Sequence, residues 1–217
     1  MATDIGRTLA SDLGRAFGEI DLAIGRTRAA RPTVTVSVQA SFAARWLIPR
    51  LHRFDMIAPG VDLRILTTSR LINLAREGID CAIRLGPGNW PGLVATPLMP
   101  HLEGPVLRAG ANASAPHRRV VLAGREDEWT PWQDLATAPT VRTLPTRELV
   151  IDAVLAGAGV GILDTTIVAA ELERAELQFL APPRASGWSY YFVAPAYSFG
   201  RKEVKAFAQW MLEEARG

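Results

Sequence analysis

Small polar residues stand at three places where a predicted strand gives way to a predicted helix: Gln39-Ala40-Ser41, Thr67-Thr68-Ser69 and Thr143 to Thr146. Free backbone N–H groups and the helix dipole at such a junction attract a carboxylate or another anion. A hydroxyl at the same position also commonly caps the helix, so Ser41 and Ser69 have a structural interpretation beside the binding one. The two roles are compatible, because a capping hydroxyl can turn toward a ligand.

The sequence lacks the residue patterns that catalysis or cofactor binding would need. The three histidines, His52, His101 and His117, are widely spaced and form no metal-ligand pattern, and no serine lies in a nucleophile-elbow pentapeptide. The glycines from Gly157 to Gly161 lead from a helix into a strand, the reverse of a dinucleotide-binding turn. Cys81 lies in a strand of buried type, where a thiol is usually inert. We therefore expect a protein that is not an enzyme and takes no metal or cofactor.

The composition is that of an ordinary folded chain. It has 217 residues, 48% hydrophobic and 21% charged, with a net charge of 24 − 22 = +2. That surplus is too small to indicate nucleic-acid binding, and a single cysteine excludes an internal disulfide framework. No apolar run approaches the roughly 20 residues of a membrane span, and the N-terminus carries charges in place of an apolar signal core. We expect a cytoplasmic protein with no membrane partner.

Residues 3–28 are predicted to form one long amphipathic helix. Apolar side chains recur at spacings of three and four on a single face, namely Ile5, Leu9, Leu13, Phe17, Ile20 and Ile24. Such a helix is marginal when isolated and needs a surface to pack on. Periodicity alone leaves two possibilities open, a helix folded back on its own domain and a helix that pairs with its copy in a dimer.

The rest of the chain is predicted to alternate strands and helices, which indicates parallel sheets with right-handed crossovers. We expect strands at 33–38, 61–66, 79–85, 93–98, 104–109, 119–123, 139–143, 160–163 and 188–193. We expect helices at 41–56, with an interruption at Pro49, and at 70–77, 131–135, 146–156, from Thr165 onward and at 201–215. Glu126 to Trp129 is predicted to lie in a polar connection.

Several longer segments resemble the effector-binding domain of LysR-type transcriptional regulators, and most closely the subgroup of the glycine-cleavage activator and the β-lactamase regulator. The matching segments are Val36-Ser37-Val38, Ser41 to Leu51 with Phe54, Pro59 to Arg64, Leu74 to Arg84, Gly86 to Leu93, Ala153 to Gly161, Tyr190-Tyr191 and Phe207 to Leu212. The resemblance is dense over 33–98 and 146–216 and thin between them. Thr3 to Leu9 also resembles the family's junction into its linker helix.

This resemblance implies an α/β fold of two Rossmann-like subdomains of periplasmic-binding-protein type, joined by crossing strands and preceded by a long linker helix. The expected division is 1–31 for a linker and dimerisation helix, 32–100 with 188–217 for subdomain I, and 101–187 for subdomain II. The family pairs subunits through the linker helix, which favours a homodimer. Its helix-turn-helix would lie before Met1, so we expect no sequence-specific DNA binding by this chain alone.

By the same resemblance, loops from both subdomains surround a pocket for a small effector that carries a carboxylate or another anion. The implied ligand-binding residues are Gln39, Ala40, Ser41, Phe42, Thr67, Thr68, Arg84, Leu85, Thr143, Thr146 and Asp164. Besides Ser41, two of them have competing interpretations. Arg84 could instead make an ion pair on the surface, and Asp164 could cap the helix that starts at Thr165.

The middle of the chain departs from the family pattern. Leu102 to Arg142 is compressed and rich in Ala, Gly and Pro, and we expect Trp129 and Trp132 to cover its thin core. This departure leaves a further possibility open, namely that the chain is a degenerate remnant that dimerises but binds no ligand. A stand-alone periplasmic-type binding protein is a further alternative, although the linker helix and the lack of a signal peptide argue against it.

Overall fold

A computed structural model describes residues 3, 12–19, 31–68, 73–135 and 140–216 of the chain. The chain divides into two units. Unit 1 comprises 1–43, 47–99 and 189–217, and unit 2 comprises 44–46 and 100–188. The long strands β4 (Leu93–Arg108) and β9 (Arg184–Pro195) each run from one unit into the other, and they are hydrogen-bonded neighbours.

Unit 1 is built on a sheet with the strand order β2-β1-β3-β9. The strands β1 (Thr33–Val38), β2 (Asp62–Thr67) and β3 (Cys81–Gly86) run parallel, as predicted, and β9 joins β3 in the antiparallel direction. Val34, Val36 and Val38 are fully buried on one face of β1, as the alternating pattern requires. The carboxyl ends of β1 and β2 therefore lie side by side.

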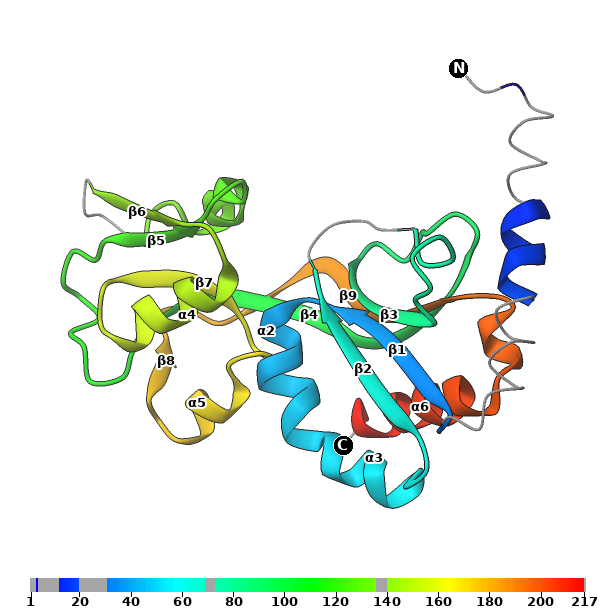
Figure 1. Cartoon of the computed structure of the whole chain (residues 1–217). Helices are drawn as coiled ribbons and strands as arrows, with labels where there is room; N and C mark the ends of the chain where they lie inside the picture. Colours follow the sequence, from blue (N-terminus) through cyan, green and yellow to red (C-terminus); the bar gives the residue numbers. More distant parts are fainter. Residues whose placement is uncertain (1–2, 4–11, 20–30, 69–72, 136–139, 217) are drawn as a thin grey trace. The chain divides into compact units, whose positions relative to one another are not determined.

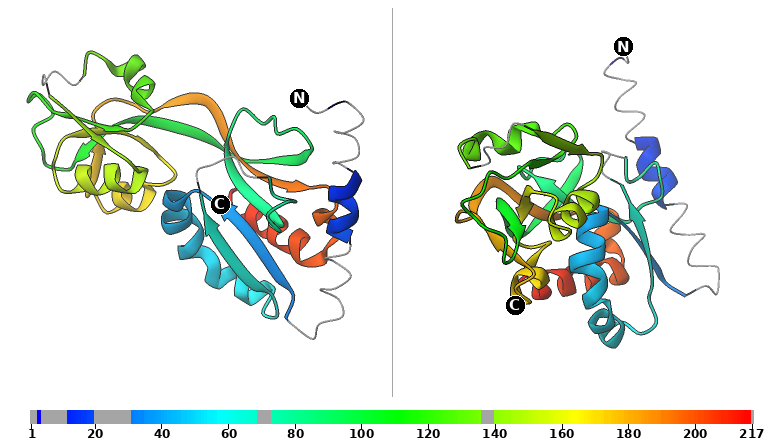
Figure 2. Two further views of the ribbon diagram at one scale, coloured as in Figure 1. Left: turned by 45° about the horizontal axis from the view of Figure 1, so that its top comes forward. Right: turned by 90° about the vertical axis from the view of Figure 1, so that its left-hand side faces the viewer.

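One helical run follows β1 and packs on this sheet (Figures 1 and 2). It passes through α2 (Ala40–Phe42), a π-helical turn (Ala43–Leu47), a 3-10 turn (Ile48–Arg50) and α3 (Leu51–Ile57). Pro49 has no N–H to donate, which explains the predicted interruption. The helix α6 (Lys202–Glu214) follows the 3-10 turn Ser198–Gly200 and closes the core, where Phe54, Phe207 and Trp210 meet at ring distances of 5.3–5.6 Å.

The predicted helix at 70–77 is wrong over its described part. Residues 74–78 form turns, which begin after Asn73 and end at Gly78 with a positive φ of 65°. The side chain of Asn73 accepts a hydrogen bond from the Arg76 amide at 3.1 Å, which stabilises the turn locally. The beginning of this predicted helix, with Ser69, lies outside the described residues.

Residues 12–19 are helical, within the predicted helix of 3–28 (Figure 1). Two members of its apolar stripe are described, and both are largely exposed, Leu13 to 47% and Phe17 to 63%. The other members of the stripe lie outside the described residues. Gly18 of the same helix faces the ring of Tyr197, so the described part of the helix touches unit 1 on one side and leaves Leu13 and Phe17 largely exposed.

Unit 2 is built around β7 (Val160–Asp164), which pairs with β4 on one side and with β5 (Arg119–Leu122) on the other. The strand β6 (Val141–Leu144) runs parallel to β5 at the sheet edge, and β8 (Leu177–Phe179) pairs with β4. The helices are α4 (Arg147–Leu155), α5 (Ala169–Glu173) and the 3-10 helix Glu126–Trp132.

Several predictions for unit 2 need correction. The strands expected at 93–98 and 104–109 are one strand, β4, and residues 165–168 form turns before α5 begins at Ala169. The expected polar connection and the short helix at 131–135 are replaced by the 3-10 helix, which ends at Trp132 and buries Glu128. In α4, Val150, Ile151 and Val154 are buried, while Leu149 is 45% exposed.

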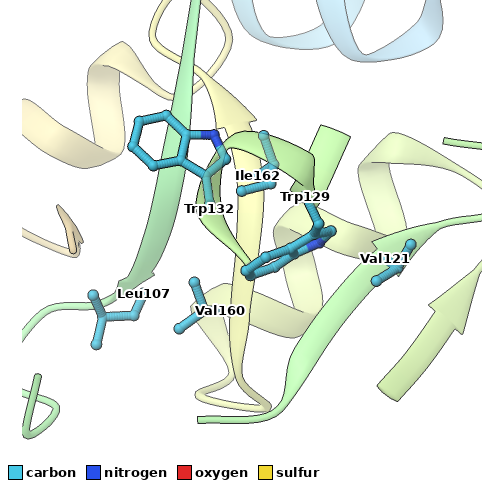
Figure 3. Packing of buried hydrophobic residues seen from close by; sticks show 6 residues of the cluster. All are labelled: Leu107, Val121, Trp129, Trp132, Val160 and Ile162. Carbon is cyan, nitrogen blue, oxygen red and sulfur yellow. The ribbon is translucent and has the colours of Figure 1, made fainter. Parts of the chain in front are cut away.

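The core of unit 2 contains the two tryptophans of the compressed segment (Figure 3). Trp129 and Trp132 are only 4% and 3% exposed and belong to one apolar cluster with Leu107, Val121, Val160 and Ile162. The guanidinium of Arg119 lies 5.1 Å from the centre of the Trp129 ring. The prediction that these tryptophans cover the core is therefore confirmed.

Gly159→Ala should destabilise unit 2 strongly. Gly159 leads into β7 with φ +150°, and a Cβ there would meet the carbonyl oxygen of Arg118 well inside contact distance. Backbone strain of this kind costs roughly 1–3 kcal/mol, and the clash adds to it. The matched control is Gly200→Ala, where a Cβ meets no atom within 4 Å. Urea unfolding of both variants tests this, and similar free energies of unfolding would contradict it.

Candidate functional site

The junction after β1 in unit 1 holds the first group of candidate residues. Val38 pairs with Thr67 across the ladder, and the Thr68 amide donates to the Val38 carbonyl oxygen at 3.0 Å. The structure thus brings Gln39 to Phe42 next to Thr67 and Thr68. The Ser41 side chain is only 5% exposed, and its hydroxyl makes no hydrogen bond to any described residue. The interpretation of Ser41 as a helix cap is wrong, because Gln39 occupies the N-cap position.

Arg84 reaches this junction from β3. Its Nη2 donates to the Ser37 hydroxyl at 2.8 Å, and its Nη1 donates to the carbonyl oxygens of Ser37 at 3.2 Å and Ile83 at 3.1 Å. The residue is 9% exposed and pairs with no carboxylate in the described part of the chain. The interpretation of Arg84 as one half of a surface ion pair is therefore wrong. Burial lowers the pKa of its guanidinium, because no opposite charge offsets the loss of hydration.

Leu85 and Phe42 meet around one aromatic ring in unit 1. Leu85 lies opposite Tyr190 in the β3–β9 ladder, and the rings of Phe42 and Tyr190 are 4.6 Å apart. Phe42 is fully buried and Leu85 is half-buried. Because side chains alternate along a strand, Leu85 and Tyr190 lie on the opposite face of the sheet from Arg84.

In unit 2 the candidate residues lie at the carboxyl ends of the strands, which share one end of the sheet because β5, β6 and β7 run parallel. Thr143 is exposed in β6, and Thr146 caps α4 by accepting a hydrogen bond from the Leu149 amide at 3.4 Å. Asp164 at the end of β7 is 4% exposed and accepts a hydrogen bond from the Thr166 amide at 2.9 Å. This bond stabilises a turn, and the prediction that Asp164 caps a helix at Thr165 is wrong, because residues 165–168 form turns and Val168 is the N-cap of α5.

Charged residues that the sequence analysis did not single out lie at the same edge of unit 2. Glu128 is buried and pairs with Arg147, and also with Arg125 at 3.1 Å. Arg147 donates to the carbonyl oxygen of Ile162 in β7 at 2.7 Å. His101 lies 3.8 Å from the Asp164 carboxylate. Arg147 is 19 residues from Glu128 and His101 is far from Asp164 in the sequence, so no local pattern reveals these two contacts.

The comparisons with known proteins identify the family. Residues 27–216 match the family model of the LysR substrate binding domain. The chain belongs to the LysR family. One relative, the HTH-type transcriptional activator AmpR of Pseudomonas aeruginosa, is 30% identical over 207 residues, which cover 86% of this chain and 69% of AmpR. The glycine cleavage system transcriptional activator of Escherichia coli K12 is 28% identical over 239 residues, covering 99% and 76%.

A solved structure agrees with this assignment. The effector domain of the transcriptional regulator AmpR of Pseudomonas aeruginosa superimposes with a TM-score of 0.71 at 27% identity, covering 85% of this chain and 96% of that domain. The predicted fold class and family are confirmed. The chain is the effector-binding domain of a LysR-type transcriptional regulator.

Membership of the LysR family also decides between the function classes considered above. The relatives are transcriptional regulators, so the expectation of a regulator and not an enzyme is confirmed. LysR-type regulators bind small-molecule effectors, typically oligomerise and contact DNA through a helix-turn-helix. Within the described ranges, three or more His, Cys, Asp or Glu side chains nowhere gather in a way that suits a metal ion. The described helices include none with the length and apolar character needed to cross a membrane.

Proposed function

We propose that this LysR domain senses a small anionic effector and that it works as a homodimer in the cytoplasm, where its target DNA lies. The observation that carries the anionic assignment is Arg84. A buried cation normally has a buried counter-charge, because removing it from water costs several kcal/mol. Among the described residues, Arg84 donates hydrogen bonds only to uncharged oxygen atoms. Its Nε–H and one Nη2–H have no acceptor among these residues.

Ser41 supports the same ligand class. Ser41 is only 5% exposed, its hydroxyl has no hydrogen-bond partner among the described residues, and it lies one residue into the helical run that begins at Ala40. The amides at the start of this run precede its first helical hydrogen bond, from the Ala43 amide to the Gln39 carbonyl oxygen at 2.9 Å. The hydroxyl and these amides are donors that suit a carboxylate, with Thr67 and Thr68 beside them.

In unit 2 we assign the binding role to Thr143 and to the exposed surface of Thr146. Asp164 is engaged inside unit 2, so its role toward the effector is to fix the turn that follows β7.

Isothermal titration calorimetry of the whole chain tests this function. A set of small carboxylates and phosphates is titrated alongside neutral amides of the same shape. We expect binding by members of the anionic set, and an affinity that falls with rising salt because charge attraction is screened. Binding confined to neutral or cationic compounds would contradict the proposal. Binding by none of the compounds would favour the remnant that dimerises without a ligand.

The dimer is expected to form through the helix that includes residues 12–19. Leu13 and Phe17 are exposed, and a large apolar side chain gains about 1.5–3 kcal/mol on burial. Sedimentation at micromolar concentration should give a dimer for the natural chain and more monomer for Leu13→Glu/Phe17→Glu. The matched control, Met56→Glu, changes an exposed residue of α3 and should leave the dimer intact. A monomeric natural chain whose helix content is intact by circular dichroism would contradict this.

A further inference from the structure

The helix of residues 12–19 lies beside the segment that precedes α6 (Figure 1). Within 12–19, Gly14 and Gly18 are half-buried and all the other residues are exposed. A Cβ added at Gly18 would lie 3.4–3.6 Å from Cζ and both Cε atoms of the Tyr197 ring. Such nearly equal distances to three neighbouring ring atoms place Gly18 over the face of the ring and not at its edge. The helix therefore contacts unit 1 through a glycine and an aromatic ring.

This contact uses a different side of the helix from the apolar stripe. Successive residues of an α-helix are about 100° apart around its axis, and residues four apart share one side. Gly14 and Gly18 therefore share one side, and Leu13 and Phe17 share another, about 100° away. Leu13 and Phe17 stay largely exposed while Gly18 meets the ring. One helix can thus contact unit 1 on one side and present its apolar side chains on another.

The ring of Tyr197 is held in place by the core of unit 1. Tyr197 directly precedes the 3-10 turn Ser198–Gly200, and its carbonyl oxygen accepts a hydrogen bond from the Gly200 amide at 3.1 Å. Within this turn the ring of Phe199 lies 5.8 Å from that of Phe192, a fully buried residue of β9. The turn therefore presents Tyr197 to the helix from a fixed support.

Arg201, at the end of the same segment, contacts the beginning of β1. It pairs with Asp80, and its Nη2 donates to the carbonyl oxygen of Thr33 at 2.6 Å. Asp80 also accepts a hydrogen bond from the Thr35 amide at 2.8 Å. Residues 197–201 thus contact the chain at two places, at Gly18 in the helix and at Thr33, where the chain enters the sheet of unit 1.

The size of residue 18 limits this contact. Glycine destabilises a helix interior relative to alanine, and close approach of another group is one reason to have it there. A Cβ at 3.4–3.6 Å makes ordinary van der Waals contact, so alanine fits beneath the ring. A branched side chain carries two further carbons on its Cβ and has to direct at least one of them toward the ring. Residue 18 can therefore be small, but not branched.

We propose that the Tyr197 ring is a docking site for the helix of residues 12–19 of the same chain, with Gly18 as the residue that fits beneath it. The docked helix and unit 1 then move as one body, so a displacement of unit 1 reaches the helix directly. The side of the helix with Leu13 and Phe17 stays exposed. This inference goes beyond the proposed function, and it depends neither on effector binding nor on the dimer.

Nuclear Overhauser contacts between Tyr197 and Gly18 test the docking. The full chain is prepared with labelled glycine and tyrosine, and Gly18→Ala and Tyr197→Leu identify the two sets of signals. We expect contacts between the Tyr197 ring protons and the Gly18 α protons, whose signals should be shifted upfield because they lie over the ring face. A folded natural chain without these contacts would overturn the proposal. Contacts found only between differently labelled copies in a mixed sample would also overturn it, because the helix would then dock on a second copy.

A size series at position 18 tests the fit in the same spectra. Gly18→Ala should keep the contact through its methyl group, whereas Gly18→Ile should lose all contacts between the Tyr197 ring and residues 12–19. Gly14→Ile is the matched control, because it makes the same change one turn earlier, where a Cβ meets no atom within 4 Å. It should keep the contact of Gly18 with the ring. Equal loss or equal retention in the two isoleucine variants would contradict the proposed fit.

Sedimentation of Gly18→Ile separates the docking from the dimer. Because the substitution leaves Leu13 and Phe17 in place, we expect the variant to have the same association state as the natural chain. Circular dichroism of both isoleucine variants shows whether their helix content is equal. A change of association state in Gly18→Ile that Gly14→Ile does not share would place Gly18 in the contact between copies and overturn the docking within one chain.

Discussion

Ser41→Asp should abolish binding of the anionic effector, and Ser41→Ala should weaken it by about 1 kcal/mol, roughly fivefold. Aspartate puts a negative charge at the place proposed for the ligand's own charge, whereas alanine removes one hydrogen bond and keeps the backbone donors. The side chain at this position is buried and has no described partner to lose. The difference between the two variants therefore reports on charge and not on contact alone.

Calorimetry with a carboxylate identified in the ligand screen measures these effects. Ser114→Asp is the matched control, because it adds the same charge on an exposed loop of unit 2 and should leave the affinity unchanged. Circular dichroism and thermal unfolding establish that each variant is folded. A folded Ser41→Asp chain that still binds the carboxylate would show that the anion is bound elsewhere.

Trp129→Ala should cost about 3–5 kcal/mol of the free energy of unfolding, the usual loss when a large aromatic side chain is removed from a core. Trp129 is 4% exposed and packs in the cluster with Val121 and Val160, under the guanidinium of Arg119. The matched control is Trp188→Ala. That ring is 40% exposed and contacts Arg125 at 5.3 Å, so its removal should cost about 1 kcal/mol.

Guanidinium chloride unfolding, followed by circular dichroism, tests this difference. A loss of less than about 1 kcal/mol for Trp129→Ala would contradict the assignment of the compressed segment to the core of unit 2. A loss for Trp188→Ala as large as that for Trp129→Ala would contradict the distinction between buried and exposed rings.

Local sequence patterns predict most elements because their causes are local. The alternation in Thr33–Val38 and the apolar stripe of Lys202–Glu214 each specify one buried face, and both elements occur as expected. The sequence pattern predicts β4 in two pieces, 93–98 and 104–109, and Pro100 lies in the gap between them. A proline removes an N–H but keeps an extended backbone, so the strand continues through it.

The charged groups of the candidate site are harder to predict, because their partners are distant in the sequence. Glu128 looks like part of a solvated acidic run, but Arg147, 19 residues later, neutralises it and allows its burial. The sequence alone is equally consistent with Arg84 as a surface cation. Its hydrogen bonds to Ser37, 47 residues earlier in the chain, hold it in the interior. Local capping is not reliably predicted either, because the hydroxyl of Ser41 does not cap its helix whereas that of Thr146 caps the helix that follows it.

The central claim is that Arg84 makes this domain selective for an anion, and a double comparison by calorimetry tests it most directly. A carboxylate effector and its neutral amide are each titrated into the natural chain, Arg84→Gln and Arg84→Lys. We predict that the natural chain prefers the carboxylate by about ten- to a hundredfold, the worth of a hydrogen bond between charged groups. This preference should vanish in folded Arg84→Gln and partly persist in Arg84→Lys. An equal preference for the carboxylate in the natural chain and Arg84→Gln would contradict the account.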